Sequence, residues 1–346
     1  MKDLNKKITD FHYGRFSFFI AAVFILPSIV YYAVISIKNF LYKTGLLKEK
    51  KTDIKVICVG NLTTGGVGKT PVVIEIANHF SNMNKKTVIL SRGYKGKLNN
   101  KNVNLIKTYD EILTDDPFLS GDEVNLIAHK TKNAAVITCA DRVKGAKFAK
   151  EKLNAEILIM DDGFSNRKIY KDVNIILVDS KKMFGNNFVL PLGPLREPVC
   201  EIKRADKIII VNKENDSHST AEEFIQKFKI PYVNCNIIRD KIYNIKTNEP
   251  LTDKKPAVAF SGIGQPEQFF RSLSADFDIK ETVSFDDHFS YDINTIKMLN
   301  SKLNETGAQI LLTTEKDAVK LLKFDEADKI YAVSIKADFF VDDICK

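Results

Sequence analysis

The chain has 346 residues, of which 44% are hydrophobic and 28% charged, a composition typical of a globular protein with length for about two domains. Its formal net charge of +8 predicts an anionic partner, but no arginine-rich stripe or nucleic-acid motif accompanies that charge, so we expect lipid or a phosphorylated substrate and no nucleic acid. The five cysteines (58, 139, 200, 235 and 345) lack C-x-x-C spacing, which argues against zinc and disulfides and suits a reducing compartment.

The first predicted element is an apolar segment at 16–37, bounded by Arg15 and Lys38. As a helix it would be roughly 33 Å long, enough to cross a bilayer core of about 30 Å. A cleaved signal peptide is the alternative, but the stretch is too long and lacks a clear cleavage site. Pro27 predicts a kink, which membrane helices tolerate. We therefore expect residues 1–51 to attach the protein to a membrane, either spanning it or lying in one leaflet.

A glycine-rich loop follows a strand expected at 54–59 and precedes a helix expected at 71–82. This order is the layout of a P-loop, in which backbone N–H groups turn onto phosphate oxygens at a positive helix N-terminus. The pattern predicts that Lys69 reaches the β- and γ-phosphates of a nucleotide and that the Thr70 hydroxyl binds Mg²⁺. Position 63 is Thr where the strict pattern has Gly. The expected nucleotide-binding residues are Thr63, Thr64, Gly65, Gly66, Val67, Gly68, Lys69, Thr70 and Pro71.

Beyond residue 52 the sequence predicts alternating strands and helices, typical of a doubly wound α/β core with a parallel sheet. We expect a P-loop kinase core at 52–238, a polar linker at 239–256 and a second, smaller α/β lobe at 257–346. Ligands of such folds bind at the carboxyl ends of the strands, which predicts a site in a cleft between the lobes. The further expected strands are 87–91, 134–138, 157–160, 173–178, 207–211, 257–261, 279–285 and 309–313, and the further helices are 122–131, 141–153, 219–229, 265–274 and 291–305.

Several acidic residues fall at the ends of these elements. Asp161 and Asp162 end the strand at 157–160, as in a Walker B element, and are predicted to hold Mg²⁺ opposite Thr70. The alternative is a polar strand end without a metal. Asp122 lies in a Gly-Asp-Glu sequence where a loop meets a helix, and its spacing alone predicts a helix N-cap.

Other polar residues lie in the loops. His288 follows Asp287 in the C-terminal lobe; a single His is usually structural, but beside a phosphate site a His–Asp pair can take the proton from an attacking hydroxyl. Arg92, Tyr94 and, in a proline-rich loop, Arg196 are candidate contacts of a substrate or phosphate. The Thr-Glu-Lys-Asp sequence at 314–317 is expected to cap a helix.

The order of these motifs resembles one family, the tetraacyldisaccharide 4′-kinases, which are the lipid A 4′-kinases of Gram-negative bacteria. The resemblance extends from the apolar N-terminal segment to about residue 322. Each motif is weak alone, but together and in order they are specific. The resemblance rests on VGNLTTGGVGKTP, SRGY, GDE, DRVKGA, DDGF, LPLGPLREP, AFSGIGQPEQFF, the Asp-His pair at 287–288 and TEKDAVK.

The resemblance implies transfer of the ATP γ-phosphate to the 4′-hydroxyl of a tetraacyldisaccharide 1-phosphate. It implies ATP and Mg²⁺, a glycolipid substrate, work at the cytoplasmic face of the bacterial inner membrane, and no obligate protein partner. In the family, the Asp of GDE and the His of the Asp-His pair together activate the sugar hydroxyl, which assigns Asp122 and His288. The Glu of LREP is implicated near Mg²⁺, which assigns Glu197.

One departure from the family concerns the sequence after the paired acids. The family commonly continues them as DDGFQH, whereas this chain has Ser165 and Asn166 after Phe164. If the Gln or His helps to place nucleotide or metal, that contact is altered here. Because both acids are present, we expect activity to survive.

A rival hypothesis is a membrane-attached P-loop nucleotide switch or targeting ATPase, for which the P-loop and the apolar segment would suffice. The sequence 211–215 is similar to the guanine-reading N-K-x-D motif, but Asn215 replaces its Asp, which argues against GTP. A third hypothesis is a soluble small-molecule kinase. A switch would hydrolyse its nucleotide without transferring phosphate to an acceptor, so the two classes differ in their products.

Overall fold

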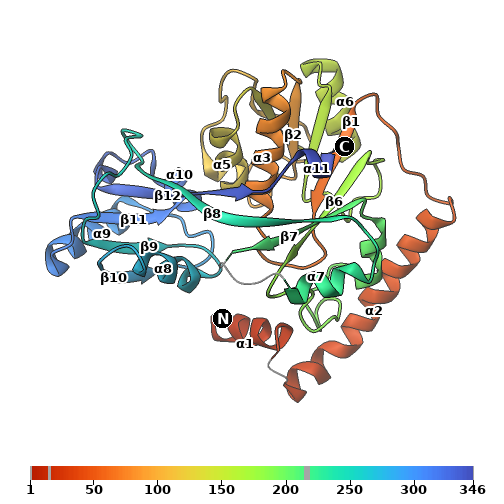
Figure 1. Ribbon diagram of the computed structural model, residues 1–346, viewed down its shortest axis with the longest axis horizontal. Helices are drawn as coiled ribbons and strands as arrows, with labels where there is room; N and C mark the ends of the chain where they lie inside the picture. Colours follow the sequence, from red (N-terminus) through yellow and green to blue (C-terminus); the bar gives the residue numbers. More distant parts are fainter. Residues whose placement is uncertain (1, 15–16, 214–218, 346) are drawn as a thin grey trace.

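The computed structural model describes residues 2–14, 17–213 and 219–345. Its described strands form one sheet with the order β10-β9-β11-β12-β8-β7-β6-β1-β5-β2-β4-β3 (Figure 1). The strands are β1 (Lys55–Gly60), β2 (Thr87–Ser91), β3 (Asn104–Lys107), β4 (Ala134–Thr138), β5 (Ile157–Asp161), β6 (Val173–Asp179), β7 (Lys207–Asn212), β8 (Tyr232–Asn244), β9 (Ala257–Ser261), β10 (Ile279–Ser284), β11 (Ile310–Thr314) and β12 (Ile330–Asp338).

The helices connect these strands, as an α/β fold requires. They are α1 (Lys2–His12), α2 (Phe18–Lys43), α3 (Lys69–Asn82), α4 (Pro117–Ser120), α5 (Asp122–Lys130), α6 (Arg142–Leu153), α7 (Ser219–Gln226), α8 (Pro266–Ser274), α9 (Ile293–Thr306), α10 (Glu315–Leu321) and α11 (Asp342–Cys345), with short 3₁₀ turns η1 (Val199–Arg204) and η2 (Asp325–Ala327). Every strand expected from the sequence forms, with bounds that differ by no more than one residue.

The core of the first half is a parallel sheet covered on both faces. β1 pairs in parallel with β5 and β6, and β2 pairs in parallel with β4 and β5. Apolar side chains of α3 and α5 pack on one face of this sheet, and those of α6 pack on the other. Burial on both faces explains why these strands are continuous apolar runs. The fold is therefore the doubly wound α/β core that the sequence predicts.

The second lobe shares the same sheet. Residues 232–236 of β8 pair in parallel with β7, and residues 236–244 pair in antiparallel with β12. The segment expected as a linker, 239–256, therefore begins inside a strand. Many side chains of β8 are partly exposed, which polar residues tolerate. The strand therefore has no apolar run by which the sequence could indicate it. Beyond it, β9 to β12 and the helices α8 to α10 enclose two further apolar clusters.

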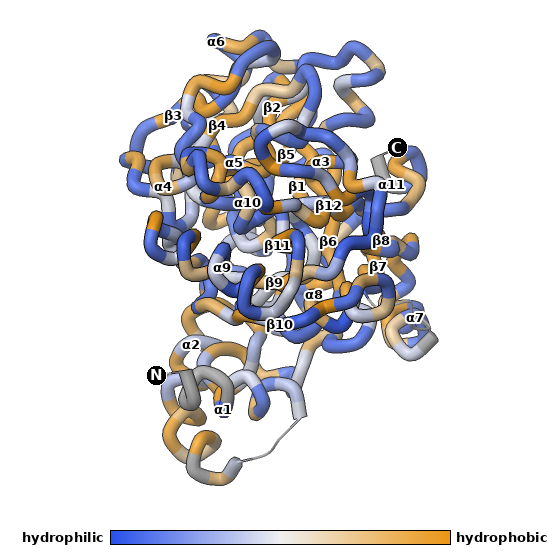
Figure 2. The backbone as a smooth tube through the Cα atoms, turned by 90° about the vertical axis from the view of Figure 1, so that its left-hand side faces the viewer, coloured by the Kyte–Doolittle hydropathy of each residue, from blue (hydrophilic) through white to orange (hydrophobic). Residues whose placement is uncertain are grey.

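The apolar N-terminal segment forms α2, which begins at Phe18 and extends to Lys43; Phe16 lies outside the described residues. One helix in the described part of the chain is long and apolar enough to cross a membrane, over Ile20–Lys43, and little of it is buried in the protein. Figure 2 shows α1 and α2 together at one end of the molecule, and in Figure 1 α2 runs along the outside of the first half. Exposed side chains of α2 include Phe18, Leu26, Ile29, Val34, Ile37 and Phe40.

A polar stripe attaches α2 to the rest of the protein. The Ser28 hydroxyl donates to the Val189 carbonyl at 2.9 Å, and the Tyr31 hydroxyl donates to the Arg196 carbonyl at 2.9 Å. Asn39, three turns after Ser28, lies on the same helix face and is also buried. α2 therefore docks through this stripe on the proline-rich loop at 189–197 and leaves its apolar surface uncovered.

Candidate active site

The P-loop joins β1 to α3 at the carboxyl edge of the sheet. Gly68 precedes α3 with a φ of 97°, a left-handed conformation that favours glycine, and so the helix begins at Lys69. The Lys69 Nζ donates to Asn61 Oδ1 at 2.9 Å and lies 3.6 Å from Asp162 Oδ1. The Thr70 side chain is buried in the first turn. Lys69 and Asp162 therefore lie close together, with Thr70 next to Lys69 in the first turn of α3.

The proline-rich loop is attached to the P-loop through Arg196. Its Nη1 donates to Asp162 Oδ2 at 2.8 Å, its Nη2 donates to Asn61 Oδ1 at 2.6 Å, and its Nε donates to the Thr63 carbonyl at 3.2 Å. The Thr64 N–H donates to the Pro194 carbonyl at 2.7 Å. Arg196 thus lies at the phosphate loop, where it was expected. Asn61 is a site residue that the sequence reasoning missed, although it stands inside the quoted motif.

The two paired acids have opposite electrostatic settings. Asp161 ends β5 in a buried position, where it accepts from Ser91 Oγ at 3.0 Å. Burial, together with the charges of Glu123 and Asp162, raises the pKa of Asp161 to about 6. Burial would also raise the pKa of Asp162, but Lys69 and the Arg196 guanidinium outweigh it and lower that pKa to about 2. Asp162 is therefore ionised at neutral pH, whereas the ionised form of Asp161 would be stabilised by a further positive charge nearby.

These oxygen donors fit Mg²⁺. Within the described ranges, no group of three or more His, Cys, Asp and Glu side chains is arranged to hold a metal unaided. Mg²⁺ does not require such a cage, because it binds through one or two carboxylates, keeps waters and takes its other ligands from substrate phosphates. The buried Thr70 hydroxyl and the Asp161 carboxylate are hard donors of this kind, and a divalent cation would supply the charge that Asp161 needs.

Glu197, expected near the metal, contacts α2 and Arg204. Its side chain is fully buried; Oε2 accepts from Asn39 Nδ2 at 3.2 Å and pairs with the Arg204 guanidinium. Arg196 thus contacts Asp162, while the neighbouring Glu197 contacts α2. In this structure the Glu197 carboxylate fixes α2 to the loop, and its expected place near Mg²⁺ stays a prediction.

Replacing Glu197 with the uncharged glutamine separates a structural role of its carboxylate from a role as a metal ligand. We expect Glu197→Gln to lower the free energy of unfolding by about 3 kcal/mol, because it leaves the buried Arg204 without its closest carboxylate. We expect the Mg²⁺ concentration for half-maximal activity to stay unchanged. Denaturant unfolding and a Mg²⁺ titration measure the two effects. Glu201→Gln is the matched control, since Glu201 also pairs with Arg204 (2.6 Å) but is less buried. A weaker Mg²⁺ response at unchanged stability would restore Glu197 as a ligand.

The two lobes meet at Asp122 and His288. His288 Nδ1 lies 3.0 Å from Asp122 Oδ2, although 166 residues separate them in the chain. Asp122 is the first residue of α5, whose N-cap is Gly121, so the N-cap interpretation of Asp122 is wrong. Gly121 has a φ of 95°, and a Cβ there would lie 2.7 Å from the Tyr94 carbonyl, so the close turn requires glycine. This turn leaves the Asp122 side chain to face His288.

Electrostatics keeps Asp122 ionised. Burial by itself raises the pKa of Asp122, but the hydrogen bond with His288 and the positive charge of Lys320 outweigh it, and the pKa is lowered below its usual value. Asp287 lies 3.7 Å from the other His288 nitrogen, Nε2. Asp122 is therefore a carboxylate at neutral pH, able to accept a proton.

Glu123 links this pair to the P-loop. Its Oε1 pairs with Lys316 Nζ at 2.5 Å. The charge of Glu123 raises the pKa of Asp161, and Lys69 helps to lower the pKa of Glu123, so all three lie within electrostatic reach of one another. Glu123, Lys316 and Lys320 were missed as site residues. The signal was available: positions 316 and 320 share one face of α10, because residues four apart are neighbours on a helix.

Arg92 and Tyr94 follow β2 at the same edge of the sheet. The Tyr94 ring is 68% exposed, and its edge lies beside the His288 ring at a centroid distance of 6.5 Å. Arg92 is exposed, and its charge contributes to lowering the pKa of the buried Arg142, which donates to the Asp161 carbonyl at 3.0 Å. Both residues thus border the site, and their contact with a substrate stays a prediction.

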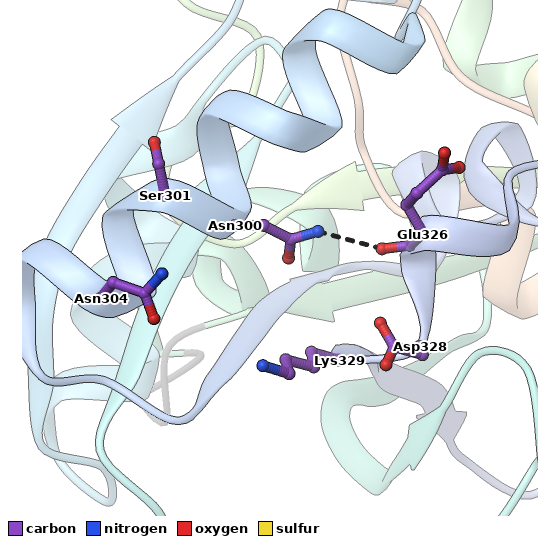
Figure 3. Close-up of a pocket in the computed structure, with 6 residues that line it drawn as sticks. All are labelled: Asn300, Ser301, Asn304, Glu326, Asp328 and Lys329. Carbon is purple, nitrogen blue, oxygen red and sulfur yellow. Dashed lines mark hydrogen bonds between the residues drawn. The ribbon is translucent and has the colours of Figure 1, made fainter.

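Two cavities differ in their relation to this site. One, of about 490 Å³, lies between α9 and η2 in the second lobe and is lined by no residue of the phosphate site (Figure 3). The other, of about 270 Å³, is lined by residues of both lobes, among them Asp179, Lys213 and Arg271. Lys213 Nζ donates to Asp179 Oδ2 at 2.7 Å and to the Gly66 carbonyl at 2.5 Å, which places this cavity beside the P-loop. Asn215, in the sequence similar to the guanine-reading motif, lies outside the described residues.

Known proteins similar to this chain share one activity in their names. The family model described as "Tetraacyldisaccharide-1-P 4'-kinase" (LpxK) matches residues 20–345. A tetraacyldisaccharide 4′-kinase of Halothermothrix orenii is 33% identical over 322 residues, covering 86% of this chain and 82% of that protein. One of Aquifex aeolicus is 34% identical over 316 residues, covering 90% and 93%. A crystal structure of LpxK from Aquifex aeolicus in complex with ATP aligns with a TM-score of 0.72 at 33% identity, over 91% of this chain and 93% of that chain.

Proposed function

This chain belongs to the tetraacyldisaccharide 4′-kinase family and is an ATP-dependent kinase of lipid A biosynthesis, and on that premise we propose which of its residues perform the transfer. The observation that carries the proposal is the contact of Asp122 with His288 across the two lobes, 3.0 Å long. Through Glu123, this pair is electrostatically coupled to Lys69 and Asp161, so a proton acceptor and a phosphate site lie within electrostatic reach of each other. A nucleotide switch would need no such acceptor.

The phosphates of ATP are assigned to the P-loop. Its N–H groups and Lys69 hold the phosphate oxygens, while Arg196 keeps Asp162 and the loop in register. Thr70 and Asp161 are the oxygen donors that we assign to Mg²⁺, with Asp162 beside them. When bound, Mg²⁺ neutralises charge on the phosphate oxygens. The fixed positive charge of Lys69 acts in the same sense, because charge spreads over these oxygens during transfer.

The acceptor hydroxyl is assigned to Asp122. As the bond between the 4′-oxygen and the γ-phosphorus forms, the bond from that phosphorus to the bridging oxygen of ADP breaks, and the hydroxyl proton passes to the Asp122 carboxylate. His288 orients this carboxylate through its contact with Oδ2. The other oxygen, Oδ1, is then the one that faces the substrate. Arg92 and Tyr94 border the same opening and are proposed to contact the disaccharide.

The cavity of about 270 Å³ is proposed to receive the base and ribose of ATP. Its lining comes from the carboxyl ends of β6 and β7 and from α8 of the second lobe, and the Lys213 contact places it next to the P-loop. Because both lobes contribute to it, nucleotide binding would draw them together. Closure excludes water from the γ-phosphate, which limits unproductive hydrolysis.

The exposed apolar surface of α2 is proposed to insert into the cytoplasmic face of the bacterial inner membrane. The glycolipid substrate carries acyl chains that remain in the bilayer, so the enzyme must work at its surface. ATP is cytoplasmic, which fixes the side. No obligate protein partner is needed for this arrangement.

The proposal predicts a metal-dependent lipid product. Purified full-length protein, ATP, Mg²⁺ and a tetraacyldisaccharide 1-phosphate in detergent should yield a bis-phosphorylated lipid, detected by mass spectrometry. A chelator should abolish the product, and added Mg²⁺ should restore it, because Asp161 and the phosphates need the cation's charge. Product formation that persists in the chelator would contradict the metal assignment. Steady ATP hydrolysis without a lipid product would instead favour the switch hypothesis.

A further inference from the structure

Lys320, in the last turn of α10, lies against the proposed catalytic pair. Its Nζ is 3.2 Å from Asp122 Oδ2, 3.1 Å from Asp317 Oδ1 and 3.2 Å from the Phe289 carbonyl oxygen. An ammonium group has three N–H donors, and these three oxygen atoms lie around it. The Lys320 side chain is only 10% exposed. The geometry is that of a fixed cation and not of a solvated surface lysine.

The second acceptor, Asp317, is itself immobilised. Its side chain is fully buried, and Oδ2 accepts from Ser261 Oγ at 3.2 Å, from the Gly262 N–H at 3.0 Å and from Thr314 Oγ1 at 2.8 Å. The sequence predicts a helix cap here, and Thr314 does cap α10. The cap explains Thr314 and the Asp317 backbone, but it does not require an ammonium group one turn later at position 320.

The third acceptor connects Lys320 to His288. The Phe289 carbonyl belongs to the residue after His288, whose φ of 63° is a left-handed conformation that side-chain-bearing residues rarely adopt. The His288 N–H donates to the Gly262 carbonyl at 3.0 Å, and the Gly262 N–H is held by Asp317. The turn that carries the His288 ring is therefore held at two points: Lys320 contacts the Phe289 carbonyl, and Gly262, which Asp317 holds, contacts the His288 N–H.

We propose that Lys320 is a positioning residue of the phosphoryl transfer, which holds Asp122 ionised and oriented and fixes the turn that presents His288. The inference rests on the proposed role of Asp122 as proton acceptor. In the described chain, the side-chain contacts of Asp122 with His288 and Lys320 both fall on Oδ2. Two donors on one oxygen fix the carboxylate plane and direct Oδ1 toward the acceptor hydroxyl.

The charges around Asp122 make Lys320 important. The Asp122 side chain is 14% exposed and lies in one lobe, whereas Lys320 comes from the other, so the contact forms only when the lobes are apposed. Without Lys320, the carboxylates of Asp122 and Asp317 would lose the cation that they share. The titratable and charged groups that surround Asp122 are His288 and Asp287 from the loop, Asp317, Lys320 and Lys316 from α10, Tyr291 below the ammonium, and Glu123 on its own helix.

The test is the pH profile of the full-length enzyme carrying Lys320→Met. We expect kcat to fall about 10-fold, the scale of a positioning effect, with the KM for ATP unchanged because the P-loop is intact. Removal of the positive charge raises the pKa of Asp122. The acid limb of kcat/KM should therefore move to higher pH, because activity requires the ionised carboxylate. Lys320→Arg, which keeps the charge but not the geometry, should lower kcat without moving that limb.

Lys323→Met is the matched control, since Lys323 is exposed in the same segment and should leave both kcat and the pH profile unchanged. An acid limb that stays in place in Lys320→Met overturns the inference, whether kcat is retained or falls only with the folded fraction measured by circular dichroism. If Lys320→Met does not fold, an unaltered kcat in Lys320→Arg overturns it. Asp122→Ala separates failure of the proposed function from failure of this inference. An active Asp122→Ala enzyme would show that Asp122 is not the proton acceptor. An inactive Asp122→Ala enzyme together with a normal Lys320→Met enzyme would contradict only the role of Lys320.

Discussion

Replacing Asp122 with alanine should lower the turnover rate by at least about 100-fold, the usual scale for one positioned acid–base group. The carboxylate contacts both His288 and Lys320, so its removal deletes the proposed proton acceptor and the contact that these two side chains share. The P-loop is untouched, and the KM for ATP should therefore change little. Steady-state kinetics on purified protein measure both values.

The chain offers a matched control for this variant. Asp115 also pairs with a histidine, with Oδ1 2.6 Å from His129 Nε2, but this pair is on the surface. Asp115→Ala removes an Asp–His contact of the same kind and should retain nearly full turnover. His288→Ala should slow the reaction, and adding it to Asp122→Ala should cost little more, because groups that act as a unit are not additive. Near-normal turnover in Asp122→Ala would remove this residue from the mechanism.

Lys69→Ala is the second large effect, also at least about 100-fold in turnover, because it deletes the positive charge at the γ-phosphate. Here the KM for ATP should rise as well, since Lys69 is proposed to contact phosphate in the ground state. The structure adds a secondary loss: Asp162 keeps only Arg196 as a close cation, so the negative charge near the phosphates increases. Equilibrium binding of ATP, measured beside kcat, separates the two contributions.

The control for Lys69 is a lysine in an exposed ion pair. Lys85 lies 2.9 Å from Glu156 on the surface, where such pairs contribute little. Lys85→Ala should leave kcat and ATP binding unchanged. If Lys69→Ala bound ATP normally and turned over at the normal rate, the assignment of the P-loop as the phosphate site would be wrong.

The sequence predicts this site best where the signal is local. The P-loop is a strand, a glycine turn and a helix within one short segment, so backbone chemistry alone places Lys69 and Thr70. The contact of Asp122 with His288 joins residues 166 positions apart, and spacing predicted only a cap and a structural histidine. Family resemblance brought these two together, because no local pattern encodes which loop of one lobe faces which helix of the other.

The remaining differences have similar physical causes. Glu197 follows Arg196 directly, yet Arg196 contacts Asp162 and Glu197 contacts Asn39 and Arg204, a difference that a motif does not encode. Lys320 was missed because the helix cap at Thr314 already gave its motif a structural explanation. β8 and β12 are partly exposed strands that pair with each other across the lobes, and their mixed polarity hides the period-two pattern that identifies strands.

The continuity of β8 has a mechanical consequence. A strand that pairs with β7 at one end and β12 at the other carries backbone pairing, with one register shift between Val333 and Ile335, from the phosphate loop's half of the molecule to the half that bears His288. Relative motion of the halves must then occur as a change in the twist of this ribbon. Such a deformation is elastic and limited in amplitude, so the two halves return to the same relative position after each turnover. A flexible linker would instead leave the two halves with more conformational entropy.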